Sequence, residues 1–178
     1  MEPAPAGKNA KVSAQAIVFQ QVNLSYGKKP ILTDVSCSIE KGSYTAIIGP
    51  SGAGKSTLLQ MIPALISPTD GSIYVDGVEV TDASADITAL RKKIGFIFQY
   101  PEQQLFAKNV YEDVVFGPRN VGISEVEAEK RAYEAIQFVG LPQDVYDLPM
   151  DKLSGGQKRR VALAGVIAMQ PDYLILDE

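Results

Sequence analysis

The fold of this chain is decided by residues 44–66, which read YTAIIGPSGAGKSTLLQMIPALI. This stretch begins with an apolar run, Ala46, Ile47 and Ile48, whose β-branched residues predict a buried strand. A loop of small residues follows, and from Lys55 onward apolar residues recur with helical spacing. A strand, a glycine-rich loop and a helix in this order form the setting in which G-x-x-x-x-G-K-[ST], here residues 49–56, indicates a phosphate-binding loop.

The residue types in this loop suit phosphate chemistry. Gly52 and Gly54 allow a backbone geometry that directs successive N–H groups at phosphate oxygens, and the following helix adds the partial positive charge of its N-terminus. Lys55 can bridge the β- and γ-phosphates, and the Ser56 hydroxyl can ligate Mg²⁺. The alternative is a glycine-rich turn without function, which a lysine and a serine in register disfavour. The predicted nucleotide-binding loop comprises Gly49, Pro50, Ser51, Gly52, Ala53, Gly54, Lys55, Ser56 and Thr57.

Length and composition restrict the class of protein. A chain of 178 residues with 46% hydrophobic and 21% charged residues predicts one substantial globular core. The net charge of −4 disfavours a nucleic-acid partner that is bound by bulk electrostatics. Cys37 is the single cysteine and there are no histidines, so neither a disulfide nor a histidine-dependent step is available within this sequence. Residues 1–15 are rich in Ala, Pro, Gly and Lys and predict a mobile tail.

Two hairpins are predicted on either side of the phosphate loop. Residues 16–27 and 31–39 read as antiparallel strands joined by a turn, and residues 72–80 form a hairpin centred on Asp76-Gly77. Tyr26 stands just before the first turn, where its ring could stack on an adenine base or simply pack against the protein. Residues 86–93 then predict a short helix, and residues 94–98 a buried strand that ends at Gln99.

Strand patterning nearly disappears after Gln99. Residues 110–116 and 125–139 read as helices separated by Gly117-Pro118. We therefore expect an N-terminal β subdomain and phosphate-loop core at residues 16–98, a helical insertion at residues 99–157, and a return to the core at residues 158–178.

Two further motifs follow the predicted helices. Ser154 caps a helix within the sequence LSGGQ at residues 153–157, where two glycines form a second candidate anion-binding turn. The basic residues 158–160 beside it favour a solvated helix face over a nucleic-acid patch. The last residues, YLILDE, read as an apolar strand that ends in two acids. Beside a bound nucleotide, Asp177 would hold the magnesium shell and Glu178 would polarise the attacking water, whereas the alternative is an ordinary acidic strand end.

Together these pieces resemble the ATP-binding cassette (ABC) family over residues 16–178, with the phosphate loop, Gln99, LSGGQ and Asp177-Glu178 in the family's order. The resemblance implies a P-loop NTPase (RecA-like) α/β core with an N-terminal antiparallel β subdomain and an inserted helical signature subdomain. It implies ATP and Mg²⁺ as ligands, adenine stacking by Tyr26, and metal and water contacts by Gln99. Two such domains would pair head to tail, so that Ser154, Gly155, Gly156 and Gln157 close on ATP held by the opposite subunit.

A narrower resemblance lies in residues 98–116, FQYPEQQLFAKNVYEDVVF, which look like the ATPases of energy-coupling-factor importers for vitamins or cobalt and nickel ions. It implies a peripheral location at the cytoplasmic face of the plasma membrane, a substrate-binding membrane component, and an integral membrane subunit that contacts residues 99–106. Leu105 and Phe106, if exposed, would form a groove for a short helix of that subunit, whereas the alternative buries both side chains. Another transporter class and a soluble ABC ATPase acting on DNA or ribosomes are the alternative functions.

The family continues past the catalytic acid with a loop and a strand that ends in a switch histidine, and this sequence contains neither. An uncovered central strand invites aggregation. We therefore expect a C-terminally truncated ABC domain that binds ATP weakly alone, and whose second ATPase subunit is either a copy or a relative.

Overall fold

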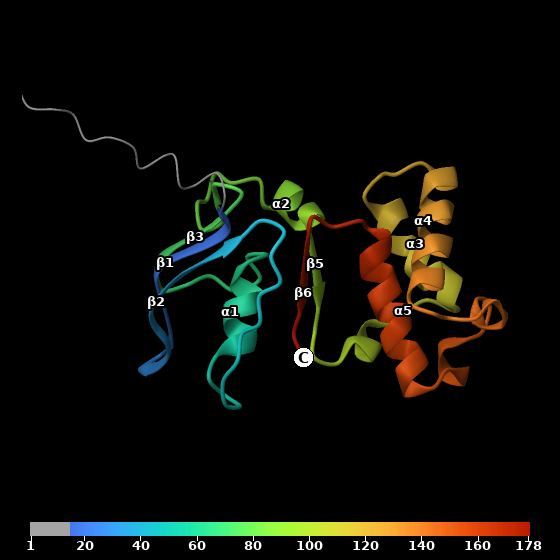
Figure 1. Cartoon of the computed structure of the whole chain (residues 1–178), viewed down its shortest axis with the longest axis horizontal. Helices are drawn as coiled ribbons and strands as arrows, with labels where there is room; N and C mark the ends of the chain where they lie inside the picture. Colours follow the sequence, from blue (N-terminus) through green and yellow to red (C-terminus); the bar gives the residue numbers. More distant parts are fainter. Residues whose placement is uncertain (1–14) are drawn as a thin grey trace, which may run out of the picture. The chain divides into compact units, whose positions relative to one another are not determined.

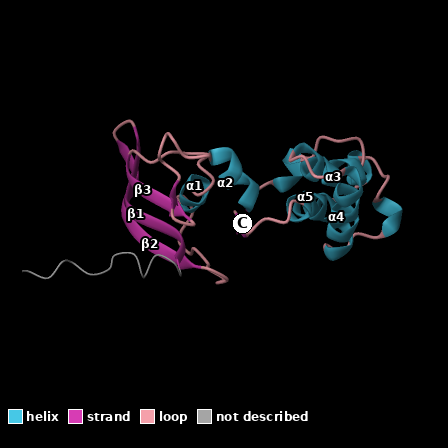
Figure 2. Ribbon diagram, turned by 90° about the horizontal axis from the view of Figure 1, so that it is seen from above, coloured by secondary structure: helices cyan, strands magenta, loops and turns pink. Residues whose placement is uncertain are grey.

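The computed structural model describes residues 15–178, so the predicted mobile tail lies outside the described residues except for the backbone of Gln15. The chain divides into two compact units, of which the first ends at Leu90 and the second begins at Arg91. Figure 1 colours the elements along the sequence, and Figure 2 distinguishes helices from strands. The chain contains both helices and strands, as the predicted α/β class requires. The strands of the first unit are antiparallel, and the two strands of the second unit are parallel.

The first unit is built on a four-stranded antiparallel sheet with the order β2-β1-β3-β4 (Figure 2). Both predicted hairpins are present, the first turning at Gly27 and Lys28 and the second at Asp76 and Gly77. Positive φ angles at Asp76 (49°) and Gly77 (79°) belong to the tight turn that an Asp-Gly pair favours. The four strands are β1 (Gln15–Tyr26), β2 (Lys29–Glu40), β3 (Asp70–Val75) and β4 (Val78–Glu79).

A bulge in β1 shifts the alternation of its buried side chains. Phe19 and Val22 are both buried although three positions separate them, a spacing that would place them on opposite faces of a regular strand. The pairing with β2 changes register between these residues, and Gln21 there has a φ of 50°. The N–H of Gln21 donates to Ser36 Oγ at 2.9 Å. Because an extra residue rephases the strand, apolar side chains on both sides of the bulge reach the core.

The predicted strand before the phosphate loop is absent. Residues 43–50 adopt no regular structure, and the side chains of Tyr44 and Ile48 are fully or almost fully exposed. A strand needs a neighbour to take its backbone hydrogen bonds, and none of the described strands pairs with these residues. The helix after the loop is present as α1 (Lys55–Met61), but it ends before Leu65, which is exposed.

The second unit begins with the last residues of α2 (Ile87–Lys93), whose N-terminus is capped by the Asp86 carboxylate through a 2.9 Å bond from the Ala89 N–H. The predicted short helix at residues 86–93 is therefore confirmed. Strand β5 (Ile94–Ile97) pairs in parallel with β6 (Tyr173–Leu176), the two apolar strands predicted to precede Gln99 and Asp177. Parallel pairing places the carboxyl ends of both strands at one edge.

Three helices form the apolar core of the second unit, α3 (Val110–Asn120), α4 (Glu125–Phe138) and α5 (Gly155–Ala168) (Figure 1). Their buried residues recur with helical spacing, as Val110 and Val114 on α3 and Ala128, Ala132 and Ala135 on α4 illustrate. Small residues on α4 and α5 let the helices approach closely. Three 3₁₀ turns complete the unit, η2 (Pro101–Gln104), η3 (Gln143–Val145) and η4 (Met150–Lys152).

The prediction that Gly117-Pro118 separates two helices is wrong, because both residues lie inside α3. A side chain at Gly117 would place its Cβ 2.6 Å from Met169 Sδ, so glycine is what allows α3 to pack closely against the end of α5. Proline removes one helical N–H, but Pro118 is fully buried near the end of the helix. Burial of its ring and the close contact at Gly117 favour continuing the helix to Asn120.

Candidate functional site

The phosphate loop has the backbone conformation that its glycines predict. Gly52 (φ 79°) and Gly54 (φ 89°) occupy the left-handed region, and Gly54 is the N-cap of α1. A Cβ at Gly54 would lie 2.9 Å from Leu32 Cδ2, so a larger residue would also press against β2. Residues 49–53 are exposed, which leaves the loop open to a ligand from solvent.

Lys55 lies at the first position of α1 and folds back over the loop. Its ammonium donates to the carbonyl oxygens of Gly49 and Pro50, each at 3.0 Å. The positive charge is therefore held beside the loop by two neutral acceptors. Phosphate oxygens carry charge and form stronger bonds with an ammonium than carbonyls do, so the loop fits a phosphate group. Ser56 and Thr57 follow in the same turn of α1 and are half-buried.

Tyr26 is the last residue of β1 and lies opposite Lys29 at the hairpin turn. Its side chain is 57% exposed, so the ring is not committed to the core. That exposure favours stacking over packing as the use of the ring, and its contact with adenine stays a prediction.

Gln99 and Glu178 meet at the shared edge of β5 and β6. The Gln99 side-chain amide donates to Glu178 Oε2 at 2.7 Å. Asp177 stands beside them with its side chain only 5% exposed, and its N–H donates to the Ile97 carbonyl at 2.9 Å. The strands therefore bring three of the predicted catalytic and metal residues to one place. No cluster of three or more His, Cys, Asp or Glu side chains that could hold a metal alone occurs within residues 15–178.

The LSGGQ sequence forms a capped helix start. Ser154 Oγ accepts from the Gln157 N–H at 3.3 Å, and Gln157 Oε1 accepts from the Ser154 N–H at 2.8 Å. This reciprocal pair is a capping box, which a Ser followed by Gln at the third position signals in sequence and which our sequence reasoning missed. Gly155 and Gly156 have open space where a side chain would be.

Of the two side chains predicted to line a groove if exposed, only Phe106 is exposed, and the groove itself stays a prediction. Leu105 packs against the apolar cluster of the helices, whereas Phe106 is 66% exposed. The Phe106 ring meets Phe116, also exposed, in an edge-to-face contact with centroids 4.8 Å apart. Asp113 holds this arrangement, because its Oδ1 accepts from the N–H groups of Phe106 and Ala107 at 3.0 Å each. The sequence analysis singled out neither Asp113 nor Phe116. The signal available was their spacing of three residues, which places both on the same face of α3.

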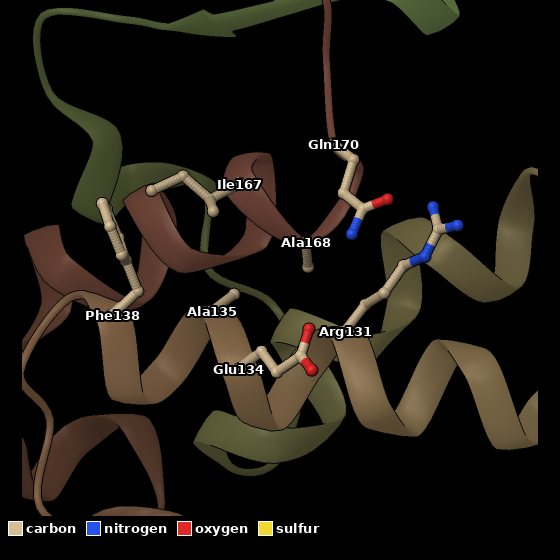
Figure 3. Close-up of a pocket in the computed structure, with 7 residues that line it drawn as sticks. All are labelled: Arg131, Glu134, Ala135, Phe138, Ile167, Ala168 and Gln170. Atoms are coloured by element: carbon tan, nitrogen blue, oxygen red, sulfur yellow. The ribbon is translucent and has the colours of Figure 1, made fainter.

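A small pocket of about 170 Å³ lies between α4 and α5 in the second unit, and Figure 3 shows its lining. Figure 3 shows Phe138 and Ile167 at one end of the lining and Arg131 and Gln170 at the other, with Ala135 and Ala168 between them. None of the predicted nucleotide-binding or catalytic residues lines it. Among residues 15–178, no helix is both long enough and apolar enough to span a bilayer.

Comparisons with known proteins identify the family of this chain. The family model described as "ABC transporter" matches residues 32–178. The "Energy-coupling factor transporter ATP-binding protein EcfA2" of Clostridium perfringens is 51% identical over 153 residues, which cover 85% of this chain and 53% of the relative. The protein of the same name from Lactococcus lactis is 47% identical over 169 residues, 91% of this chain and 59% of the relative. The chain thus spans about half the length of the curated relatives it matches.

Solved structures of ABC transporter cassettes align with this chain. The structure of cbiO1 from Clostridium perfringens, described as part of the ABC transporter complex cbiONQ, aligns with a TM-score of 0.82 at 40% identity and covers 93% of this chain and 66% of that one. The cassette MJ0796, a dimer bound to ADP and Pi in a post-hydrolysis state, aligns with a TM-score of 0.81 at 33% identity and covers 91% and 73%. This fold, the family match and the ordered motifs agree, and the chain belongs to the ABC transporter family.

Proposed function

We propose that this chain is the ATP-binding and ATP-hydrolysing part of a subunit that powers a membrane importer of the energy-coupling-factor type. The observation that carries the proposal is the phosphate loop, in which Gly52 and Gly54 have positive φ angles and Lys55 brings its ammonium to the loop. The relatives named as energy-coupling factor ATP-binding proteins support the transporter class. Vitamins or cobalt and nickel ions are the proposed class of cargo.

In this proposal the first unit binds ATP. Tyr26 stacks on the adenine ring, the N–H groups of the loop bind phosphate oxygens, and Lys55 exchanges its two carbonyl acceptors for the β- and γ-phosphates. Mg²⁺, when bound, neutralises charge on those phosphates. Ser56, Gln99 and Asp177 would hold the ion, and the burial of Asp177 suits a carboxylate that works beside a cation.

Glu178 is the proposed general base, because a carboxylate in that place can orient a water and polarise it toward the γ-phosphate. The 2.7 Å bond from the Gln99 amide to Glu178 supports a shared task for these two side chains. When water and nucleotide are present, Gln99 would exchange this bond for contacts with the water and the metal. Its position after β5 then makes Gln99 sensitive to movements of the helical segment that follows.

The remaining parts of the site concern partners. A second ATPase subunit, either a copy or a relative, would present Ser154, Gly155, Gly156 and Gln157 to the ATP of its partner. The exposed Phe106–Phe116 pair would receive a short helix of the integral membrane subunit, and the proposed location of the protein is then the cytoplasmic face of the plasma membrane. A further membrane component would bind the cargo.

The test uses the full-length protein purified with its companions from detergent-solubilised membranes. Native mass spectrometry should find it bound to a second ATPase and an integral membrane subunit, and the complex should hydrolyse ATP. Glu178→Gln should hold ATP without hydrolysing it, whereas the surface change Glu134→Gln should hydrolyse ATP at the wild-type rate. A protein that hydrolyses ATP without any membrane companion would refute the importer, and unchanged turnover in Glu178→Gln would remove that residue from the role of base.

A further inference from the structure

An ion pair connects the turn after Gln99 with the helix that carries LSGGQ. Glu102, in η2, accepts from Arg159 Nε of α5 at 3.3 Å. The Glu102 side chain is 27% exposed, so it is directed largely against protein, while Arg159 is 62% exposed. The neighbouring Pro101 is buried, and η2 packs against α5. These contacts attach η2 to the helix close behind its glycines.

The strand before Gln99 is attached to the other end of the same helix. A Cβ at Gly95 in β5 would lie 2.6 Å from Val166 Cγ1 and 2.8 Å from Pro171 Cγ, so glycine permits a close contact with the end of α5 and the residues after it. Both neighbours are stiff, one branched and one cyclic. Residues 95–102 therefore join α5 at both ends, and Gln99 lies between the two attachments.

Gln99 in turn contacts the proposed base through its 2.7 Å bond to Glu178. A displacement of the first turns of α5 would act on Glu102 through the ion pair, and Glu102 is only three residues from Gln99. The close contact at Gly95 holds the other end of α5 against β5, so a tilt of the helix about that end would move its first turns relative to β5. The movement would therefore be taken up at Gln99, where it would change the contact with Glu178.

We propose that Glu102 and Arg159 are positioning residues whose ion pair makes Gln99 follow the signature helix, so that docking of LSGGQ on a partner subunit resets the Gln99–Glu178 contact. This inference rests on the proposed function, since it assigns a coupling role within the proposed ATPase site. Glu102 is ionised for this task, because its own backbone N–H, and next the Arg159 guanidinium, hold the pKa of its carboxyl below the ordinary value.

The experiment compares variants of the full-length protein in its membrane complex. Glu102→Gln and Arg159→Gln should each lower kcat for ATP about two- to five-fold, as expected for one exposed ion pair, and leave KM for ATP unchanged. The exchange Glu102→Arg with Arg159→Glu should restore most of the lost rate. Lys130→Gln is the matched control, because it removes an exposed pair with Glu134 inside α4 that has no connection to Gln99.

A second measurement does not require turnover. Hydrogen exchange of the backbone amides of residues 99, 100 and 102–104 should become faster in Arg159→Gln and remain unchanged in Lys130→Gln, because loss of the pair releases η2. A wild-type complex without ATPase activity would refute the proposed function, and hydrogen exchange would still decide whether the pair holds η2. Unchanged hydrogen exchange in Arg159→Gln would refute the coupling role. So would a double variant with swapped charges whose kcat falls by as much as the losses of the two single variants combined.

Discussion

Gly71 gives a quantitative test of how β3 passes the bulge in β1. Its φ is 88°, and a Cβ there would lie 2.6 Å from the Gln20 carbonyl oxygen and closer still to that of Gln21. Both neighbours are backbone atoms within a paired strand, so a side chain at this position cannot be accommodated by a change of rotamer. Gly77 is the matched control, since its φ is 79° and nothing lies within 4 Å of its Cβ position.

The two glycines separate two costs. In Gly77→Ala the free energy of unfolding should fall only by the cost of a left-handed alanine, about 1–2 kcal/mol. In Gly71→Ala the same cost applies, and displacement of the β1 backbone adds a loss comparable to overpacking, about 1–3 kcal/mol. We expect the free energy of unfolding, measured by urea titration of the full-length protein, to fall by about 2–5 kcal/mol in Gly71→Ala. Equal losses in both variants would show that β3 does not approach the bulge as described.

Three further predictions follow from single contacts. Ser154→Ala should lower the free energy of unfolding by about 1 kcal/mol in a urea titration, whereas Ser124→Ala should change it little, because Ser124 caps α4 without a side-chain bond. Burial, and next the charge of Glu129, raise the pKa of Tyr111 to about 12. The stability that depends on the neutral phenol is therefore complete below pH 10 and lost as pH rises through about 12; alkaline melting curves should show this loss, and Tyr111→Phe should abolish it. Asp113→Ala should free the loop that presents Phe106 and weaken assembly with the membrane subunit in a pull-down, while ATP binding in a filter assay stays unchanged.

The elements that depend on local pattern were predictable from sequence. The Asp76-Gly77 pair specifies its hairpin because both residues tolerate positive φ angles, and α4 follows from its regular spacing of alanines. The extent of α3 was not predictable, since Gly117-Pro118 normally ends a helix. The close approach of Gly117 to Met169, which lies far along the chain, exists only in the folded unit and leaves no sign in the local sequence.

The prediction of a strand at residues 46–48 was wrong for a related reason. Apolar, β-branched residues indicate only that a segment suits a strand, whereas a strand forms when a neighbour completes its hydrogen bonds. Within the described residues no strand pairs with this segment. The exposure of Phe106 beside a buried-facing Leu105 was likewise beyond a sequence pattern, because two adjacent apolar residues give no sign of which one faces the core.

The capping box determines which atoms of LSGGQ remain as donors for the proposed phosphate. The Gln157 amide oxygen accepts from the Ser154 N–H, so the Gln157 side chain would meet a phosphate through its amide N–H groups. Ser154 Oγ serves the box as an acceptor, which leaves its hydroxyl hydrogen available as a donor. The N–H groups of Gly155 and Gly156 have no partner within the helix, because they lie in its first turn. The Ser154 hydroxyl, the first two helical N–H groups and the Gln157 amide are therefore all donors at this helix start, as the proposed contact with a partner's ATP requires.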